Sequence, residues 1–270
     1  MKSVISDGCG CFPTGRLYPG IAHLLRAVVR GLVEEFAQET PWHDIPIALL
    51  DVETTGRDAS VDRVVEIGIV IARHGIITAR YNWLLNPGIP IPAEVSAIHG
   101  IKDEDVKDSP RFEAIAHEVA AALSGCVPAA YNAAFDRAFI MNEFGRSASL
   151  TPVPAVGDGA SAASEAARQG SPSVLAPALR KEVEWVDPLV WAREIQQAEK
   201  SRALGEVAAR LGVKLENAHR ASDDAEAAAL VLYSLAKSGR IPLAYGGLVQ
   251  EQRRLALLHA DERRRWKQFS

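Results

Sequence analysis

Two carboxylates stand at the end of a row of core residues in the segment Ile45–Glu53, and this placement constrains the fold more than any other feature of the chain. The segment is short and apolar and is followed by Thr-Thr-Gly, a pattern typical of a buried strand that ends in a turn. Alternation places one set of side chains on the same face: Ile47, Leu49, Asp51 and Glu53. Burial of an unpaired carboxylate costs several kcal/mol, so this face needs a compensating charge.

Two predicted helices carry an acid in the same kind of position. In the helix Ala133–Phe144, Asp136 shares a face with the apolar residues three, four and eight positions later. In the helix Ala221–Lys237, Asp224 shares a face with the apolar residues four, seven and eleven positions later. No Lys or Arg occupies a matching position, so the four acids are predicted to lack a basic partner.

Divalent cations are the simplest partners for such a cluster. Carboxylate oxygens without cysteine favour a hard ion, Mg²⁺ or Mn²⁺. Four acids suit two ions about 3.5–4 Å apart, the arrangement used for in-line phosphoryl displacement. His219 precedes Asp224 by five residues and would face another way on a common helix, so we expect it in the loop before the helix. From there its imidazole can take a proton from a water molecule.

The remaining segments predict an α/β fold with a mixed sheet of five strands flanked by helices. Val64–Ile71 and Ile76–Leu85, joined by a His-Gly turn, complete an antiparallel meander of three strands. Glu66 alternates opposite its apolar neighbours, and we expect a structural hydrogen-bonding role for it. The later elements are expected at Pro110–Leu123 (helix, capped by Ser109), Val127–Tyr131 (strand), Ala133–Phe144 (helix), Val183–Val186 (strand), Pro188–Gln197 (helix), Ala203–Leu211 (helix) and Ala221–Lys237 (helix).

The chain divides into a central domain and two extensions. Residues 1–44 are expected to form an N-terminal extension with an amphipathic helix over Ile21–Phe36. Residues 45–238 form the central domain, in which the Ala-, Ser-, Gly- and Pro-rich stretch 146–183 is predicted to be a flexible insertion. Residues 239–270 are expected to form a C-terminal tail, in which the arginine-rich helix Leu248–Lys267 follows a Gly-Gly pair. This basic stretch fits either a nucleic-acid contact or a solvated helix face.

Composition limits the partners of the chain. Its net charge is −4, from 30 basic and 34 acidic residues, whereas proteins that coat long duplex DNA are usually basic. A contact with nucleic acid is therefore expected to be local, at a strand end. The three cysteines do not suggest a disulfide framework, so a reducing, cytoplasmic setting fits best. No apolar run reaches the ~20 residues of a membrane span, and no signal-peptide pattern is present, so we expect no membrane partner.

Three segments resemble, in order and spacing, the motifs of the DEDDh (DnaQ-like) exonucleases. They are residues 51–56 (DVETTG), 132–136 (NAAFD) and 219–224 (HRASDD). Between the first two, residues 86–88 (NPG) and 97–101 (AIHGI) are similar to the substrate-binding segment of that family. The group includes the proofreading subunit of the bacterial replicative DNA polymerase and oligoribonuclease. Each motif alone is weak, but their combination is specific.

The resemblance implies an RNase H-like fold, two bound Mg²⁺ or Mn²⁺ ions, and release of 5′-mononucleotides from the 3′ end of single-stranded DNA or RNA. It implies four metal ligands, namely Asp51, Glu53, Asp136 and Asp224, with His219 as the general base. It also implies a set of substrate-binding residues: Thr54, Thr55, His99, Asn132 and Phe135. Two departures from the family pattern are Tyr131, where a histidine is frequent, and the length of the stretch 146–183.

Other functions remain open at this point. One is a proofreading-type subunit that acts mainly through a polymerase or repair complex. Another is an oligoribonuclease-like enzyme specific for RNA, and a third is an RNase H-like nuclease that cuts internally. The five catalytic-type residues argue against a purely binding role, and the histidine placement with the AIHGI segment favours cutting at an end.

Overall fold

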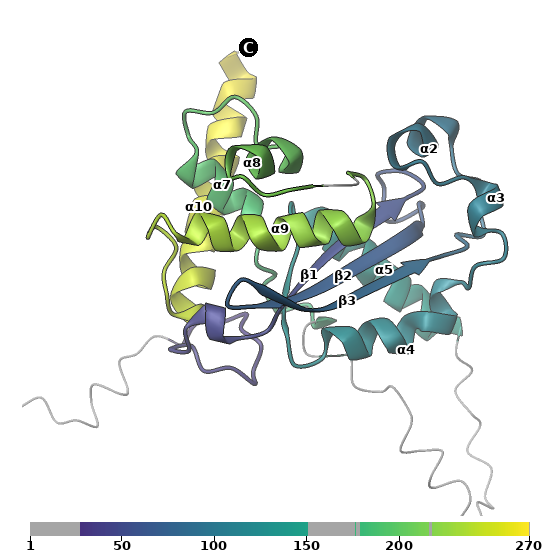
Figure 1. Ribbon diagram of the computed structural model, residues 1–270, viewed down its shortest axis with the longest axis horizontal. Coiled ribbons are helices and arrows are strands. Elements are labelled where there is room, and N and C mark those ends of the chain that lie inside the picture. Colours follow the sequence, from purple (N-terminus) through teal and green to yellow (C-terminus); the bar gives the residue numbers. More distant parts are fainter. Residues whose placement is uncertain (1–27, 151–175, 177–178, 216–217, 270) are drawn as a thin grey trace, which may run out of the picture.

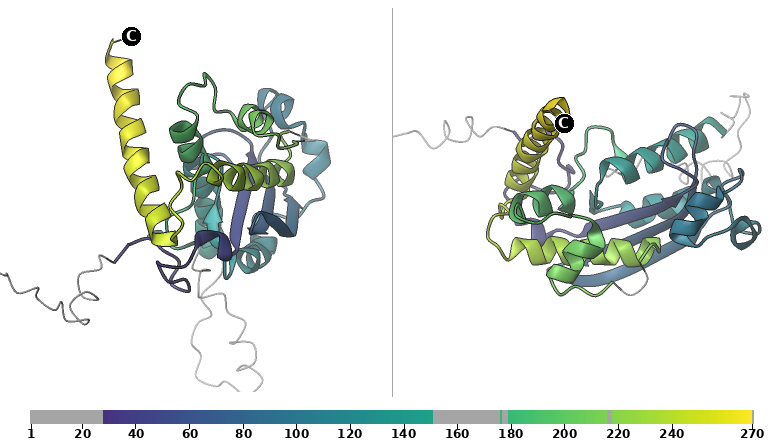
Figure 2. Two further views of the ribbon diagram at one scale, coloured as in Figure 1. Left: turned by 60° about the vertical axis from the view of Figure 1, so that its left-hand side comes forward. Right: turned by 90° about the horizontal axis from the view of Figure 1, so that it is seen from above.

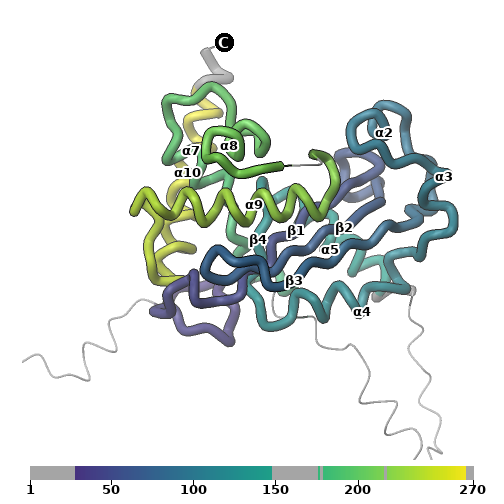
Figure 3. The backbone as a smooth tube through the Cα atoms, in the orientation of Figure 1, coloured from purple at the N-terminus to yellow at the C-terminus, as the bar shows by residue number. Residues whose placement is uncertain are grey.

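The computed structural model describes residues 28–150, 176, 179–215 and 218–269, and its centre is a four-stranded sheet (Figure 1). The strands are β1 (Ile47–Thr54), β2 (Val64–Arg73), β3 (Ile76–Leu84) and β4 (Val127–Ala129). Their order is β3-β2-β1-β4, which can be followed along the tube in Figure 3. β1, β2 and β3 pair antiparallel and β4 pairs parallel to β1, so the predicted mixed sheet with an antiparallel meander is confirmed.

The expected fifth strand is reduced to a single bridge. Val186 pairs in parallel with Ala129, and its N–H donates to the Pro128 carbonyl at 2.9 Å. After this bridge Pro188 starts the next helix, so the strand cannot extend further in that direction. The N–H of Glu184 is directed instead to the Gly31 carbonyl, at 2.8 Å. The prediction of a fifth strand over Val183–Val186 is therefore wrong.

Helices cover both faces of the sheet (Figure 2). The helical elements are η1 (Trp42–Asp44), α2 (Ala93–His99), α3 (Asp103–Val106), α4 (Phe112–Leu123), α5 (Ala134–Leu150), α7 (Pro188–Ile195), α8 (Leu204–Arg210), α9 (Ala221–Ala236) and α10 (Tyr245–Phe269). α9 packs on one face with Ile47 and Leu49 of β1, whereas α4 and α5 pack on the other with Ala48 and Leu50. The alternation of β1 between two separate cores follows the predicted period of two.

The start of α4 and the segment before it differ from the prediction. Ser109 does not cap α4, which begins at Phe112 with Arg111 as its N-cap. The Pro110 carbonyl accepts the N–H of Asn86 at 2.9 Å, which keeps Pro110 outside the helix. The short helices α2 and α3 lie in a segment for which the sequence predicted no helix.

Residues 28–36 are not helical, so the predicted helix over Ile21–Phe36 is wrong for this part, and its start lies outside the described residues. Gly31 has a φ of +84°, which a right-handed helix excludes. The N–H of Val33 donates instead to the Tyr245 hydroxyl at 3.2 Å. The segment is thus held by contacts with distant residues.

The C-terminal helix α10 starts at Tyr245 and includes both glycines that were expected to precede it. A Cβ on Gly246 would lie 2.9 Å from Cβ of Gln38, so this glycine permits close packing on the N-terminal segment. The far end of α10 extends beyond the rest of the described chain (Figure 2). Within the described ranges, none of the helices combines the length and the apolar character needed to cross a bilayer.

The predicted insertion 146–183 starts inside a helix, since α5 runs on to Leu150. Most of the stretch lies outside the described residues. At its end, Leu179 and Val183 are buried in the two cores. The division into an extension, a central domain and a tail stays a prediction.

The start of α9 lies against β2 with almost no space between the backbones. A Cβ added to Gly68 would come within 2.2 Å of the carbonyl carbon of Ala221. Gly68 is paired with Asp51 across β1 and β2. The absence of a side chain at this position therefore sets how closely α9 approaches the acidic end of β1.

We predict that Gly68→Ala lowers the free energy of unfolding by about 1–3 kcal/mol, because the methyl group overpacks this contact. Urea denaturation of the full chain measures the change. Gly205→Ala is the matched control: its Cβ would meet one side-chain atom at 4.0 Å, and alanine is favoured inside a helix. Equal stability of the two variants would contradict the close approach.

Candidate active site

Three elements bring the predicted acids together at one end of the sheet. β1 carries Asp51 and Glu53, α5 carries Asp136 in its first turn, and α9 carries Asp224 in its first turn. Carboxylate oxygens of Glu53 and Asp224 and a ring nitrogen of His219 lie within 4.8 Å of one another. The structure thus brings together side chains from stretches far apart in the sequence.

Asp136 is joined to β1 by its backbone. Its Oδ1 accepts the N–H of Val52 at 3.1 Å, and the side chain is buried. Burial raises the pKa of Asp136 well above its usual value, against the effect of this hydrogen bond. Burial also raises the pKa of Asp51, and repulsion from the neighbouring carboxylates, Asp136 first, raises it further. The two acids therefore resist carrying charge at the same time.

The pKa values of Glu53 and Asp224 are raised in the same way. Burial, together with repulsion from Asp224 and other carboxylates, raises the pKa of Glu53 to about 8. Burial also raises the pKa of Asp224, while the backbone N–H of His219 lowers it. All four pKa values are raised, so the site contains more negative charge than its protein surroundings compensate.

The donor atoms of the site and the lack of compensating charge show whether divalent cations fit there. The donors are carboxylate oxygens with one imidazole nearby, a set suited to hard ions such as Mg²⁺ and Mn²⁺. Arg220 lowers the pKa of Glu53, but it is the smallest of the influences on that group and does not cancel the repulsion. The residues present therefore fit a cation site.

His219 occupies the turn before α9, as predicted from its spacing to Asp224. Its backbone has a φ of +68°, in the left-handed region, and its N–H donates to Oδ2 of Asp224 at 3.1 Å. This hydrogen bond holds the turn against the first turn of α9. The histidine is exposed, so solvent and ligands can reach its ring.

Glu66 has the structural role that its position predicted. It is fully buried, and its carboxylate accepts hydrogen bonds from Arg220 at 2.6 Å, from Nδ2 of Asn82 at 3.0 Å and from the N–H of Ala221 at 3.2 Å. Burial alone would raise the pKa of Glu66, but these hydrogen bonds lower it below its ordinary value. Sequence reasoning did not identify Arg220, the N-cap residue of α9, as the partner.

Two predicted substrate-binding residues use their hydroxyls within the chain. Thr54 and Thr55 are buried at the end of β1. The Thr54 hydroxyl donates to the Gly56 carbonyl at 2.6 Å, and the Thr55 hydroxyl donates to Oδ1 of Asp62 at 3.2 Å. These bonds shape the loop that follows the first motif.

The structure places His99 near Glu66 and His219. It is buried at the end of α2, and its Nδ1 accepts the N–H of Ile101 at 3.0 Å. Burial lowers the pKa of His99, and the backbone of Thr54 and the ring of His219 are both close enough to affect it. Within the described part of the chain, Nε2 of His99 has no hydrogen-bond partner. A buried polar atom of this kind is available to a ligand.

Asn132 lies just before α5, and Phe135 stands next to Asp136 in its first turn. Asn132 is exposed with a φ of +69°, and Phe135 packs against Phe139 with ring centroids 4.9 Å apart. Sequence reasoning missed the residue that holds this turn, Asp187. Its carboxylate accepts the N–H groups of Asn132, at 2.9 Å, and of the next residue, at 3.2 Å. The Asp-Pro pair that caps α7 was the available signal.

The comparisons with known proteins agree with the motifs. A family model described as Exonuclease matches residues 49–232. The 3′-5′ exonuclease DinG of Staphylococcus saprophyticus is 28% identical over 197 residues, and the protein of the same name from Staphylococcus aureus is 27% identical. Each match covers 73% of this chain but 19% of the relative, so the chain spans about a fifth of these curated relatives.

Solved structures show the same fold at low identity. A zinc-bound complex of E. coli ExoI with single-stranded DNA has a TM-score of 0.56 at 17% identity, covering 74% of this chain and 42% of that one. E. coli exonuclease I with a dA16 oligonucleotide has a TM-score of 0.55 at 16% identity, covering 73% and 41%. The likeness supports the predicted RNase H-like fold.

We predict that Arg220→Ala lowers the free energy of unfolding by about 2 kcal/mol. The change leaves the buried Glu66 carboxylate without its charged partner, a loss reduced here because Arg220 is 45% exposed. Arg80→Ala is the matched control. Arg80, on β3, also pairs with a residue of α9, Glu226, at 2.7 Å. This pair lies at the surface, so its removal should lower the free energy of unfolding by less than about 1 kcal/mol. Denaturation curves that shift equally for both variants would contradict the prediction.

Proposed function

This chain belongs to the exonuclease family whose model spans residues 49–232, and we propose that it removes nucleotides from the 3′ end of single-stranded DNA or RNA, releasing 5′-mononucleotides. One observation carries the proposal: four carboxylates with raised pKa values meet beside one exposed histidine. Such a site is costly for the folded chain, and hydrolysis of a phosphodiester with the help of cations accounts for it.

The four carboxylates are the proposed ligands of two Mg²⁺ or Mn²⁺ ions. The ligand set consists of Asp51, Glu53, Asp136 and Asp224. When bound, such ions supply positive charge that stabilises the phosphoryl group and the leaving oxygen during in-line displacement. The protein contributes fixed positions, because β1 and the first turns of two helices hold the oxygens in place before a substrate arrives.

His219 is the proposed general base. A nitrogen of its neutral imidazole accepts the proton of the attacking water, a role that requires an accessible ring close to the carboxylates. The exposed turn and the 3.1 Å hydrogen bond from its backbone to Asp224 meet both requirements. The side chain can turn toward the water while the backbone stays in place.

The proposed substrate contacts lie around this centre. We assign Nε2 of His99 to the terminal nucleotide, and its lack of a hydrogen-bond partner among the described residues supports this role. Thr54 and Thr55 would contact it through the backbone of their loop, since their hydroxyls are already engaged. Asn132 and Phe135, at the start of α5, would contact the nucleotide from the opposite side.

The relatives support the direction of cutting and the kind of strand. The staphylococcal relatives are named 3′-5′ exonucleases, and the structural neighbours named above hold single-stranded DNA or an oligonucleotide. Because the chain spans about a fifth of those relatives, their complete activities need not apply to it.

A direct test uses the full chain with 5′-labelled single-stranded DNA and RNA, with Mg²⁺ or with a chelator. Shortening from the 3′ end that requires the metal supports the proposal, and the faster substrate identifies the preferred nucleic acid. Internal fragments would indicate an internally cutting nuclease instead. If neither substrate is shortened, the proposal fails for this chain.

We predict that Asp136→Asn and His219→Ala each lower kcat/KM at least ~100-fold, because one removes a cation ligand and the other the proton acceptor. Circular dichroism should show an unchanged fold. Asp223→Asn is the matched control: this neighbour of Asp224 lines a separate cavity of about 700 Å³ with Arg80 and Glu226. Wild-type rates in both test variants would refute the assigned roles.

We also predict that Mg²⁺ raises the Tm of the wild-type protein more than NaCl of equal ionic strength. The gain should be smaller for Asp51→Asn, which removes one ligand. In chelator, the same variant should be at least as stable as wild type, because it relieves repulsion in the cluster. Thermal unfolding in the three buffers measures both effects, and identical gains would count against cation binding at these carboxylates.

A further inference from the structure

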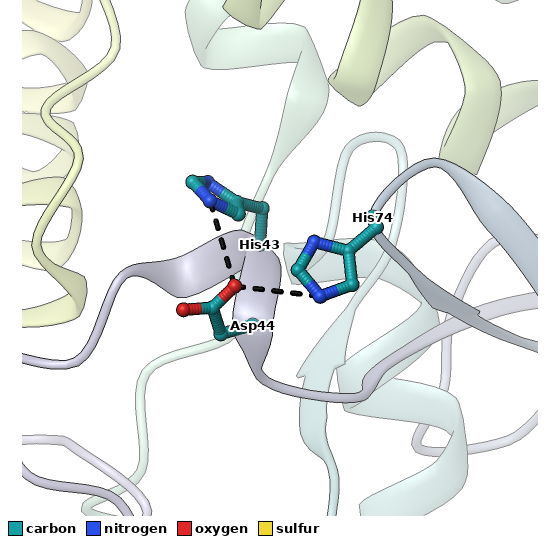
Figure 4. Close-up of side chains that lie close together, drawn as sticks. All are labelled: His43, Asp44 and His74. Carbon is teal, nitrogen blue, oxygen red and sulfur yellow. Dashed lines mark ion pairs between the residues drawn. The ribbon is translucent and has the colours of Figure 1, made fainter.

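Two histidines and an aspartate converge at the other end of the sheet (Figure 4). His43 and Asp44 belong to η1, just before β1, and His74 begins the turn between β2 and β3. Oδ1 of Asp44 lies between the two rings, 3.5 Å from Nε2 of His43 and 3.4 Å from Nε2 of His74. The exonuclease proposal makes no use of these residues.

The distances are those of ligands that share an ion. Both exceed the length of a good N–H···O hydrogen bond, about 2.7–3.2 Å. Bonds of about 2.0–2.1 Å to a tetrahedral zinc ion place neighbouring ligands about 3.3–3.4 Å apart. One donor atom from each residue lies within 4.8 Å of the other two. Small side-chain movements would therefore complete a coordination shell.

The turn that presents His74 also holds it beside His43. His74 and Gly75 both have positive φ, +54° and +75°, as in a two-residue type I′ hairpin turn. Asparagine is preferred at the first of these positions, so a histidine there makes the turn less favourable. The N–H of His74 also donates to the His43 carbonyl at 3.0 Å, which holds the two residues together. The turn thus fixes the backbone of His74 next to His43 and Asp44.

The site is distinct from the carboxylate cluster in place and in chemistry. In the β1–β2 pairing, Ile47 lies opposite Ala72 at this end and Glu53 lies opposite Glu66 at the other. Six residues of strand separate them, about 20 Å. Two imidazoles with one carboxylate suit zinc and similar ions, whereas Mg²⁺ prefers oxygen ligands.

We propose that His43, Asp44 and His74 bind a divalent transition-metal ion of the Zn²⁺ class. The side chains are 36%, 39% and 51% exposed, so an ion can enter and water can fill the remaining position. The bound ion joins the segment before β1 to the β2–β3 turn. That segment is already tied to the C-terminal part of the chain, since Trp42 packs on Tyr233 and donates its N–H to the Leu243 carbonyl.

Equilibrium dialysis of the full chain with Zn²⁺, in excess Mg²⁺ to occupy the carboxylates, tests the proposal. Wild type should bind one more Zn²⁺ per chain than either His43→Ala or His74→Ala. His219→Ala should keep this ion, which separates it from any zinc at the carboxylates. Zn²⁺ at a hundredfold excess over its Kd should raise the wild-type Tm by about 5 °C, with a smaller rise in the two variants.

His117→Ala is the matched control. Like His43, His117 is followed by an acid, Glu118, whose carboxylate lies 4.0 Å from its ring. Among the described residues, however, His117 belongs to no group of three possible metal ligands. Asp44→Asn, which preserves shape, covers the case in which a histidine variant fails to fold. Unchanged zinc binding in His43→Ala, His74→Ala and Asp44→Asn would overturn the proposal. Loss of exonuclease activity alone would not, because the two sites share no residue.

Discussion

The contact between the start of α9 and β2 is the interaction on which the rest of the site depends. Gly68 permits the backbones to meet, and the buried Glu66 binds Arg220 and the first N–H of α9. Together they place Asp224 and the preceding His219 opposite the acids of β1. A side chain at position 68, or an unpaired charge at position 66, would move the histidine and the helix away together.

The carboxylate cluster opposes folding, and the two cores outweigh it. Burial first, and then repulsion from other carboxylates, raise the pKa values of all four acids, so each costs stability when it is charged. The sheet tolerates this loss of stability because β1 is buried on both faces, between α9 on one side and α4 and α5 on the other. Functional sites often hold groups with perturbed pKa values that lower the stability of the folded chain until a ligand binds.

Local patterns predicted the parts of the fold that depend on one element at a time. Period-two alternation placed Ile47 and Leu49 on the α9 face of β1, and spacing placed His219 ahead of α9. The predictions failed where a partner decides the conformation. The apolar spacing of 21–36 indicated a helix, but Gly31 and the bond from Val33 to Tyr245 hold residues 28–36 in another form. Val183–Val186 had strand character, but its pairing is a single bridge at Val186, and the N–H of Glu184 donates to the Gly31 carbonyl instead.

The sequence by itself determined which residue types are available and which face of its own strand or helix each one occupies, because both periods are properties of the backbone. It therefore indicated the carboxylate cluster and a structural Glu66. Only the tertiary structure decided that Arg220 is the partner of Glu66, that Asp187 holds the turn at Asn132, and that His74 meets His43 and Asp44. These pairs join residues tens of positions or more apart. The packing of the two cores brings them together, and a local sequence pattern contains no information about which distant groups will meet.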